Sequence, residues 1–217
     1  MNQDEKKIKV AEAALDYIEN GQIIGVGSGT TVHALINQFD KVKSKIEAVV
    51  SSSELTTQMV EAKNIKVIEL KESGSIPIYI DGADESNTKK QLIKGGGGAL
   101  TREKIIANAS KNFICMIDDS KYVKTLGKFP LPIEVIKMSQ SIVALEIIKL
   151  GGRPVYRENY VTDNGNVILD IHNLEILEPI LLEQKINNIP GVVTNGLFAL
   201  RGADNLLIAD GNGIKIK

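Results

Sequence analysis

Two aspartates follow an apolar run of the chain and could move protons between the hydroxyls of a sugar. Asp81 and Asp84 lie in DGADE, directly after the run IPIYI at residues 76–80. Gly82 allows the backbone to turn, so that the two carboxylates can converge on one pocket. Carboxylates at the end of a strand serve as general acids and bases or bind a divalent cation. The alternative is a polar turn held by Asx hydrogen bonds.

A run of four glycines precedes a third acidic residue. The segment KGGGGALTREK covers residues 94–104. Four glycines are costly in conformational entropy, so a loop that exposes its backbone to a ligand explains them better than a spacer. Lys94 would add a positive charge there, and Glu103, one turn into the next helix, could point back toward the loop. The alternative for Glu103 is an acid favoured by the helix dipole, and Arg102 and Lys104 are expected to be solvated.

A phosphate-binding loop is indicated by GVGSGTT, residues 25–31. Its glycines permit tight curvature, and the hydroxyls of Ser28, Thr30 and Thr31 stand beside the start of a helix, a combination that suits a phosphate. No Lys follows the last glycine, so it is not a Walker A loop, and Thr30 occupies the place of the third glycine of a dinucleotide fingerprint. A turn with an N-cap is the alternative.

A lysine after another apolar run could contribute to the same site. Lys121 lies in DDSKYVKTLG, residues 118–127, which follows the run NFICMID at residues 112–118. Its ammonium group could pair with a phosphate or a carboxylate at the edge of a sheet. A capping turn with surface lysines is the alternative.

Composition excludes several other classes of function. The 217 residues include 26 Lys plus Arg and 27 Asp plus Glu, so the charge of -1 creates no global field to attract nucleic acid or an anionic membrane. No apolar run approaches the roughly 18 residues of a membrane span and no signal peptide is visible, so we expect a cytoplasmic protein. The single Cys115 excludes an internal disulfide, and it is expected in the core. His33 and His172 are distant in sequence, so no metal site is expected.

These candidate residues need a parallel sheet to bring them together. Strands are predicted at residues 22–26, 46–50, 65–70, 76–80 and 112–118. Helices are predicted at residues 54–63 and 99–110. A helix at the start of the chain is predicted to bury Ile8, Ala11, Leu15 and Ile18. Another, capped by Thr30 or Thr31, is predicted to bury Val32, Leu35, Ile36 and Phe39. Strands that alternate with such helices indicate βαβ units and a mainly parallel sheet, whose ligand sites form at the carboxyl ends of strands.

The pattern changes after about Lys124. Strands are predicted at residues 131–136, 154–157, 166–171 and 192–200, with helices at 140–150 and 179–187. This β-α-β-β-α-β order is typical of a small ferredoxin-like domain. The apolar end of the chain, residues 205–217, could return to the first sheet.

Taken in order, GSGTT, DGADE, KGGGGALTREK and DDSKYV are far more specific than any one alone. They resemble the signature of the ribose-5-phosphate isomerase A family, as do the later LPIEV, GG-P-V, TDNGN-ILD and NLLIADGNG segments, and no motif position departs from it. The resemblance implies a Rossmann-like α/β domain, here residues 1–126 plus 202–217, and a smaller α/β domain, residues 127–201, expected to serve oligomerisation. It also implies a homodimer or homotetramer that uses no cofactor.

The activity that the resemblance implies is aldose–ketose isomerisation. D-Ribose 5-phosphate and D-ribulose 5-phosphate would interconvert through a cis-enediolate, in the non-oxidative pentose phosphate pathway. Glu103 is implied as the base, Asp81 as the group that opens the sugar ring, Asp84 as a holder of sugar hydroxyls, and Lys94 with the glycine amides as donors to the developing oxyanion. The implied substrate contacts are Ser28, Gly29, Thr30, Thr31, Asp81, Gly82, Ala83, Asp84, Lys94, Gly95, Gly96, Gly97 and Lys121.

Two other classes share parts of this pattern. Aminosugar-phosphate isomerase-deaminases and sugar lactonases also combine glycine-rich loops with carboxylates, but they place a catalytic histidine beside the acidic motif, and neither His33 nor His172 is near DGADE. A sugar-phosphate sensor of a transcription regulator would carry a helix-turn-helix ahead of the first strand. Only about 20 residues precede residue 22, so we expect the isomerase.

Overall fold

The computed structural model describes residues 1–217 and divides them into two compact units. Unit 1 comprises Met1–Ala83, Arg102–Tyr122 and Ala203–Lys217. Unit 2 comprises Asp84–Thr101 and Val123–Gly202. No helix has the length and apolar character needed to cross a bilayer.

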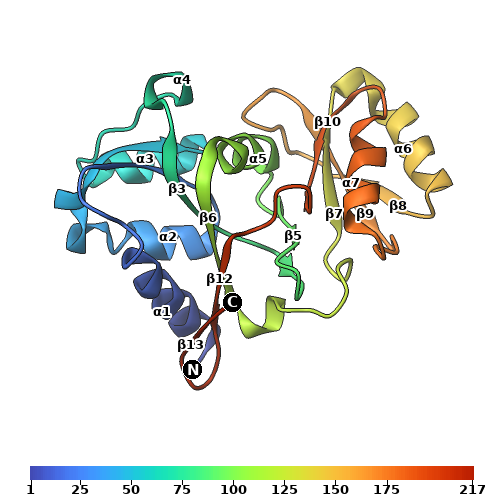
Figure 1. The fold of residues 1–217 in the computed structure, drawn as a ribbon. Coiled ribbons are helices and arrows are strands. Elements are labelled where there is room, and N and C mark those ends of the chain that lie inside the picture. The colour runs from blue at the N-terminus through green and yellow to red at the C-terminus, as the bar shows by residue number, and fades with distance from the viewer. The chain divides into compact units, whose positions relative to one another are not determined.

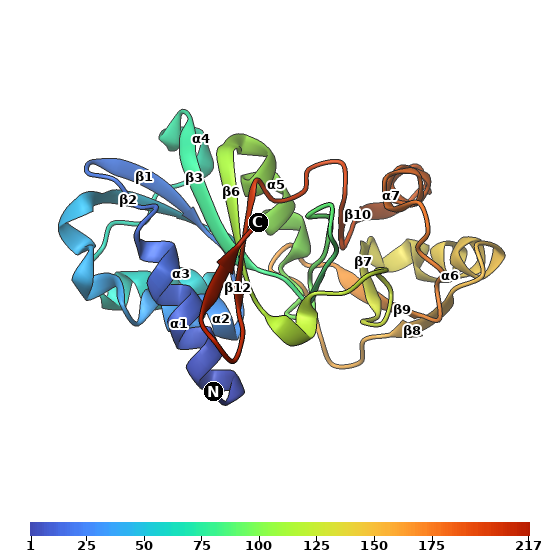
Figure 2. The same cartoon turned by 60° about the horizontal axis from the view of Figure 1, so that its bottom comes forward.

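Unit 1 is built on a six-stranded sheet in the order β13-β12-β6-β3-β1-β2 (Figures 1 and 2). Its strands are β1 (Gln22–Val26), β2 (Ile46–Ser51), β3 (Ile76–Gly82), β6 (Ser110–Asp118), β12 (Asn205–Ala209) and β13 (Ile214–Ile216). All neighbours pair in parallel except β12 and β13, which are antiparallel. The predicted mainly parallel sheet is therefore confirmed, and so is the return of the chain's end to it.

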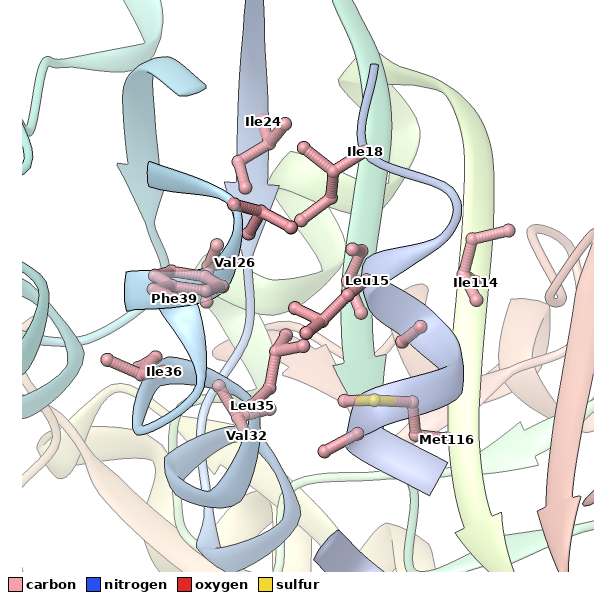
Figure 3. Close-up of a cluster of buried hydrophobic side chains, with 14 of the residues drawn as sticks. Leu15, Ile18, Ile24, Val26, Val32, Leu35, Ile36, Phe39, Ile114 and Met116 are labelled. Carbon is pink, nitrogen blue, oxygen red and sulfur yellow. The ribbon is translucent and has the colours of Figure 1, made fainter. Parts of the chain in front are cut away.

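The helices of unit 1 are α1 (Gln3–Leu15), α2 (Thr30–Ile36), α3 (Glu54–Ala62), the short α4 (Leu70–Ser73) and α5 (Leu100–Ala109), whose first turn spans the boundary between the units. Helices α1 and α2 pack on one face of the sheet, where Ile24 and Val26 of β1 point (Figures 2 and 3). A β-carbon on Gly25 would point to the other face of the sheet, toward Ile106 of α5. The alternation of a strand thus separates the α1/α2 core from the α5 layer.

The main core of unit 1 agrees with the predicted inner faces, with one exception. Val32, Leu35, Ile36 and Phe39 are fully buried, as predicted (Figure 3). In α1 the buried stripe consists of Val10, Ala11, Ala14 and Leu15. Ile8 lies outside that stripe and is 52% exposed, so its predicted place in the core is wrong.

The predicted strand at residues 65–70 is also wrong. Only one bridge forms there, from Val67 to Val49, with the Ile68 amide donating to the Val49 carbonyl at 2.9 Å. The next residues turn into α4, whose start is closed by a capping box between Glu69 and Glu72. The helix start therefore ends the pairing at the edge of the sheet after a single residue.

Unit 2 contains a four-stranded antiparallel sheet in the order β10-β7-β9-β8. The chain runs through β7 (Leu131–Val135), α6 (Gln140–Lys149), β8 (Arg153–Tyr156), β9 (Val167–His172), α7 (Pro179–Asn187) and β10 (Val192–Asn195). This confirms the predicted β-α-β-β-α-β order. Alternate residues of β7 and β9 form one core with α6 and α7, so both helices cover the same face of this sheet.

A second, three-stranded sheet in unit 2 joins β11 (Leu197–Phe198), β5 (Leu92–Ile93) and β4 (Glu85–Ser86). The predicted strand at 192–200 is therefore two strands in two sheets, separated at Gly196, whose amide donates to the Pro132 carbonyl at 2.7 Å. This sheet also places residues 84–101 in unit 2, whereas we expected them in the Rossmann-like domain. Strands of two residues leave no periodic signal in the sequence, which explains the difference.

Candidate active site

The candidate residues of unit 1 gather at the carboxyl ends of three neighbouring parallel strands. In register, Val26 of β1 is paired with Ile80 of β3, and Asp81 of β3 is paired with Cys115 of β6. The chain segments that leave these strands therefore meet at the carboxyl-terminal ends of the strands, which is where ligands bind in open α/β sheets.

Ser28 links two buried carboxylates. Its hydroxyl donates to Oε1 of Glu103 at 2.6 Å, and its backbone amide donates to Oδ1 of Asp81 at 3.2 Å. Glu103 is 3% exposed and Asp81 is fully buried. The structure thus brings together three residues that the sequence separates by 75 positions, and it turns Glu103 toward the sheet edge rather than outward as a dipole partner.

Asp81 is held by donors on both carboxylate oxygens. The Gly82 amide donates to Oδ1 at 2.7 Å, and the Tyr79 hydroxyl donates to Oδ2. Gly27 packs against the same carboxyl group, since a β-carbon on it would lie 1.8 Å from Cγ of Asp81. Only glycine fits there, because any side chain would displace the carboxylate.

Tyr79 stays protonated at any ordinary pH. Burial raises the pKa of its phenol well above the usual 10.0, and the negative charges of Asp81 and Glu103 raise it further. The phenol is therefore a permanent donor to Asp81.

Tyr79 and Gly27 are site residues that the sequence analysis missed. A signal for Tyr79 existed, because residues two apart on a strand share a face and Tyr79 stands two before Asp81. Gly27 belongs to the glycine-rich segment that was identified, but its contact with Asp81 depends on the pairing of β1 with β3.

The loop after β1 presents backbone amides rather than capping hydroxyls. Helix α2 begins after Gly29, which has φ of +89° and is its N-cap, and no side chain caps it. The predicted Thr30 or Thr31 cap is therefore wrong. Thr30 is exposed and Thr31 is buried. The first amides of α2 have no acceptor within the helix, and this arrangement favours an anion such as phosphate.

Lys121 reaches the end of β3 from the segment after β6. It closes a 3-10 turn at Asp119–Lys121, which is capped by Asp118, and its Nζ donates to the carbonyl of Ala83 at 2.8 Å. The partner is a neutral carbonyl, so the ammonium charge remains available to an anion. The capping turn that we gave as the alternative is therefore present, and the binding of an anion by Lys121 stays a prediction.

Unit 2 holds the other candidate residues, in the segment that contains the four glycines. The Gly96 amide donates to Oδ2 of Asp84 at 2.8 Å, and the Gly98 amide closes a turn to the Gly95 carbonyl at 2.9 Å. Lys94 is 3% exposed, and its Nζ lies 5.5 Å from the centre of the Phe198 ring. Asp84 and the glycine segment therefore form one hydrogen-bonded group.

The remaining predictions concern residues outside these groups. Arg102 forms an ion pair with Glu54 at 2.8 Å, so it is not simply solvated. Cys115 is fully buried, as predicted. His33 lies in α2, and His172 ends β9, a central strand of the four-stranded sheet. No group of three or more His, Cys, Asp and Glu side chains is arranged to hold a metal ion.

The arrangement in unit 1 suits proton transfer at carbon beside a bound anion. A buried carboxylate oriented by a hydroxyl can act as a general base, and a second carboxylate with fixed donors can exchange protons with hydroxyl groups. Amides at a helix start and a lysine lie at the same sheet edge and can bind a phosphate.

Comparison with known proteins identifies relatives over nearly the whole chain. The family model described as ribose 5-phosphate isomerase A (phosphoriboisomerase A) matches residues 48–213. A second model, the DeoR C terminal sensor domain, matches only residues 2–72. Ribose-5-phosphate isomerase A of Legionella pneumophila (strain Corby) is 54% identical over 210 residues, 97% of each chain.

Solved structures agree with these sequence matches. The crystal structure of ribose 5 phosphate isomerase A from Neisseria gonorrhoeae is 42% identical, with a TM-score of 0.97 over 99% of this chain and 96% of that one. A structure of D-ribose-5-phosphate isomerase in complex with phospho-erythronic acid is 34% identical, with a TM-score of 0.96 over 100% and 99% of the two chains.

Proposed function

Because this chain belongs to the ribose-5-phosphate isomerase A family, it interconverts ribose 5-phosphate and ribulose 5-phosphate, and we propose that Glu103 is the base of this reaction. The observation that carries the proposal is the link from Ser28 to both Glu103 and Asp81. The enzyme is an aldose–ketose isomerase of the pentose phosphate pathway.

Glu103 moves one proton between neighbouring carbons. Its carboxylate removes the proton from C2 of the open-chain aldose, the C2–H electron pair forms the C1–C2 double bond of a cis-enediolate, and the carbonyl electrons move to O1. The same carboxyl group then returns the proton to C1 while the proton on O2 passes to the neighbouring O1, which leaves the ketone at C2 and a hydroxyl at C1. Burial of Glu103 supports this role, because a carboxylate shielded from water retains the proton between the two steps.

Asp81 opens the sugar ring. Ribose 5-phosphate is mostly a closed furanose, so a proton must leave the anomeric hydroxyl while the ring oxygen gains one. Asp81 has fixed donors from Tyr79, Gly82 and Ser28, which hold its carboxylate in one orientation. This supports the role, because a proton relay needs a carboxylate at a constant place.

The phosphate is bound by amides and a lysine of unit 1. We assign it to the start of α2, with Gly29, Thr30 and Thr31, and to the ammonium group of Lys121. The open amides at Gly29–Thr31 and the uncompensated charge on Lys121 support this assignment. Gly82 and Ala83 then line the path between phosphate and reacting carbons.

The sugar hydroxyls and the developing oxyanion are assigned to unit 2. Asp84 would hold hydroxyls, and Lys94 with the amides of Gly95, Gly96 and Gly97 would stabilise the enediolate. The hydrogen bond between Gly96 and Asp84 supports a common role. Phospho-erythronic acid, the ligand of the solved relative, would bind here too, because its carboxylate has the shape and charge of the enediolate oxygens.

The protein acts in the cytoplasm as a homodimer or homotetramer, and unit 2 supplies part of the contact. Ile142, Leu145 and Ile148 form an exposed apolar row on α6 at a spacing of three residues, which supports a partner on that face. Sedimentation of the wild type and of Leu145→Glu tests this, since the variant should shift toward monomer.

The direct test of the function is to mix the purified protein with ribose 5-phosphate and follow the ketose. We expect ribulose 5-phosphate to accumulate until equilibrium, and the reverse reaction from ribulose 5-phosphate. A protein that is folded by circular dichroism and forms no ketose would contradict the function.

A further inference from the structure

Arg157 joins a partly buried ion pair to the backbone of the glycine segment. Its Nε donates to Oδ2 of Asp170 at 2.8 Å and its Nη2 donates to Oδ1 at 2.5 Å. The same guanidinium donates from Nη1 to the Gly96 carbonyl at 3.2 Å and from Nη2 to the Gly95 carbonyl at 3.5 Å. Asp170 belongs to the TDNGN-ILD motif, which has no role in the proposed reaction.

The glycine segment and Arg157 both lie on the face of the four-stranded sheet that is opposite α6 and α7. Pro132 of β7 is paired with Asp170 of β9, and both side chains point away from the α6/α7 core. A β-carbon on Gly95 would lie 3.3 Å from Cγ of Pro132, so the glycine segment packs on this face. Arg157, two-tenths exposed, lies where sheet and segment meet.

A fixed carbonyl determines the direction of the next amide. The peptide unit is planar and trans, so the N–H of Gly97 points opposite to the Gly96 carbonyl that Arg157 holds. The amides on either side are already used, by Asp84 at Gly96 and by Gly95 at Gly98. The Gly97 amide has no acceptor within the protein, and a β-carbon there would meet no atom within 4 Å.

We propose that Arg157, held by Asp170, is a positioning residue that fixes the Gly96–Gly97 peptide so that the Gly97 amide donates to the enediolate oxygen. This inference rests on the proposed function of the glycine amides. An amide that is held in place before the reaction stabilises developing charge without reorganisation. Tyr160 adds to the restraint, since its hydroxyl donates to the Gly97 carbonyl at 3.0 Å.

The position requires arginine rather than any positive charge. The guanidinium group donates to Asp170 from Nε and Nη2, and to the carbonyls of Gly96 and Gly95 from Nη1 and Nη2. A lysine ammonium is a single point charge and cannot reach the carboxylate and both carbonyls at once. Arg157→Lys therefore keeps the charge and loses the orientation of the peptide.

The C-terminal end of the glycine segment, at the start of α5, is held by other hydrogen bonds, so a change at Arg157 tests the glycine peptides alone. Buried Glu134 accepts hydrogen bonds from Thr101, Thr162 and Asn166, so the start of α5 is held without Arg157. A change at Arg157 should thus affect the glycine peptides and leave the position of Thr101 unchanged.

The experiment compares Arg157→Lys with the control Arg153→Lys, an exposed arginine at the start of β8, four residues before Arg157. We expect Arg157→Lys to lower kcat at least about 10-fold with little change in KM, and to lower the affinity for phospho-erythronic acid about 10-fold. Affinity for inorganic phosphate, which is assigned to the start of α2 and to Lys121, should stay within about twofold. Arg153→Lys should match the wild type in every measurement.

A structural signal distinguishes positioning from general damage. In the wild type, phospho-erythronic acid should shift the 15N–1H resonance of the Gly97 amide downfield, and in Arg157→Lys that shift should be lost. A folded Arg157→Lys protein with wild-type kcat and the same Gly97 shift would overturn the inference, as would equal losses for both ligands. If Arg157→Lys does not fold, Asp170→Asn takes its place with the same expectations. A wild type that neither isomerises ribose 5-phosphate nor binds phospho-erythronic acid would instead overturn the proposed function.

Discussion

Gly27 and Asp81 are packed so closely that a β-carbon on Gly27 would lie inside the van der Waals radius of the Asp81 carboxyl group, 1.8 Å from Cγ. Gly27 directly follows β1 and Asp81 belongs to the neighbouring strand β3, and the contact holds the Asp81 carboxylate against the loop that carries Ser28. The glycine in this place is therefore a requirement of the site.

Gly27→Ala should therefore damage both activity and stability. The methyl group must push the Asp81 carboxylate away from Tyr79 and Ser28, which costs about 1–3 kcal/mol of unfolding free energy as overpacking and at least about 10-fold in kcat. Urea unfolding and steady-state rates measure the two effects. Gly211→Ala is the control, because a β-carbon there meets no atom within 4 Å. Unchanged rates and stability in Gly27→Ala would mean that the Asp81 carboxylate can relocate freely.

Tyr79→Phe should change the dependence of stability on pH. The folded protein holds the Tyr79 proton to well above pH 10, whereas the unfolded chain releases it near the usual value of 10.0. Above about pH 10 the unfolded state thus binds fewer protons than the folded state, and the free energy of unfolding falls as pH rises, by up to about 1.4 kcal/mol per pH unit from this group.

Urea unfolding of both proteins between pH 7 and pH 11 measures this effect. At pH 7 the variant should be less stable by about 1–3 kcal/mol, because Asp81 loses a buried donor. Above about pH 10 the wild type should lose stability more steeply, so that the two curves converge. Parallel curves through pH 11 would show that the phenol ionises equally in both states.

The larger elements of the fold are predictable because their signals are local. Runs such as residues 22–26 and 76–80 became β1 and β3, and the inner face of α2 is the one that its periodicity indicates. The two-residue strands β4, β5 and β11 carry no such signal, because pairing between distant residues defines them. The sequence therefore could not show that residues 84–101 associate with unit 2.

The candidate site divides in the same way. Ser28, Asp81 and Glu103 stand in motifs, and their residue types suit the chemistry whatever their neighbours. Tyr79 stands two residues before Asp81 on one strand, so its contact could have been predicted, whereas Arg157 acts through Gly96, which only the folded chain brings near. A residue whose role lies in a tertiary hydrogen bond leaves no pattern in a single sequence.

Lys121→Ala should weaken substrate binding more than turnover. A charge that contacts the phosphate equally in the ground and transition states changes KM rather than kcat. We expect KM for ribose 5-phosphate and Kd for inorganic phosphate to rise at least about 10-fold, with kcat within a few-fold of wild type. Lys124→Ala, an exposed lysine three residues later, is the control. A large fall in kcat at constant KM would place Lys121 at the reacting carbons.

Neighbouring glycines should respond oppositely to the same substitution. Gly98 has φ of +87° and faces the Tyr160 hydroxyl, 2.0 Å from an added β-carbon, so Gly98→Ala should lower the unfolding free energy by more than about 1 kcal/mol. Gly97→Ala should leave stability unchanged, since its β-carbon meets no protein atom. It should still lower kcat/KM, because the methyl group enters space assigned to substrate. Thermal melts and rates of both variants test this, and wild-type kcat/KM in Gly97→Ala would remove the substrate from that place.

Glu103→Gln distinguishes a base from a helix-dipole partner most sharply. Glutamine keeps the size of the side chain and an oxygen that accepts from the Ser28 hydroxyl, but it cannot take a proton from carbon. If Glu103 were only a dipole partner, its neutralisation would lower the free energy of unfolding by only about 0.3–1 kcal/mol, and turnover would continue. As the base, its loss should lower kcat at least about 100-fold. Glu5→Gln, in the first turn of α1, is the comparison for an acid whose carboxylate serves only its own helix start, through the dipole and the capping box with Asn2.

The Glu103→Gln protein should still bind inorganic phosphate, since Lys121 and the start of α2 are unchanged. In D₂O the ketose formed by the wild type should carry less than one solvent deuteron per turnover at C1, because burial of Glu103 retains part of the transferred proton, and the variant should incorporate essentially none. Single-turnover rates and mass spectrometry of the ketose report both quantities. A folded variant with near-wild-type turnover would transfer the role of base to Asp81 or Asp84. Loss of turnover together with loss of phosphate binding would instead show that the side chain holds the loop at Ser28 in place.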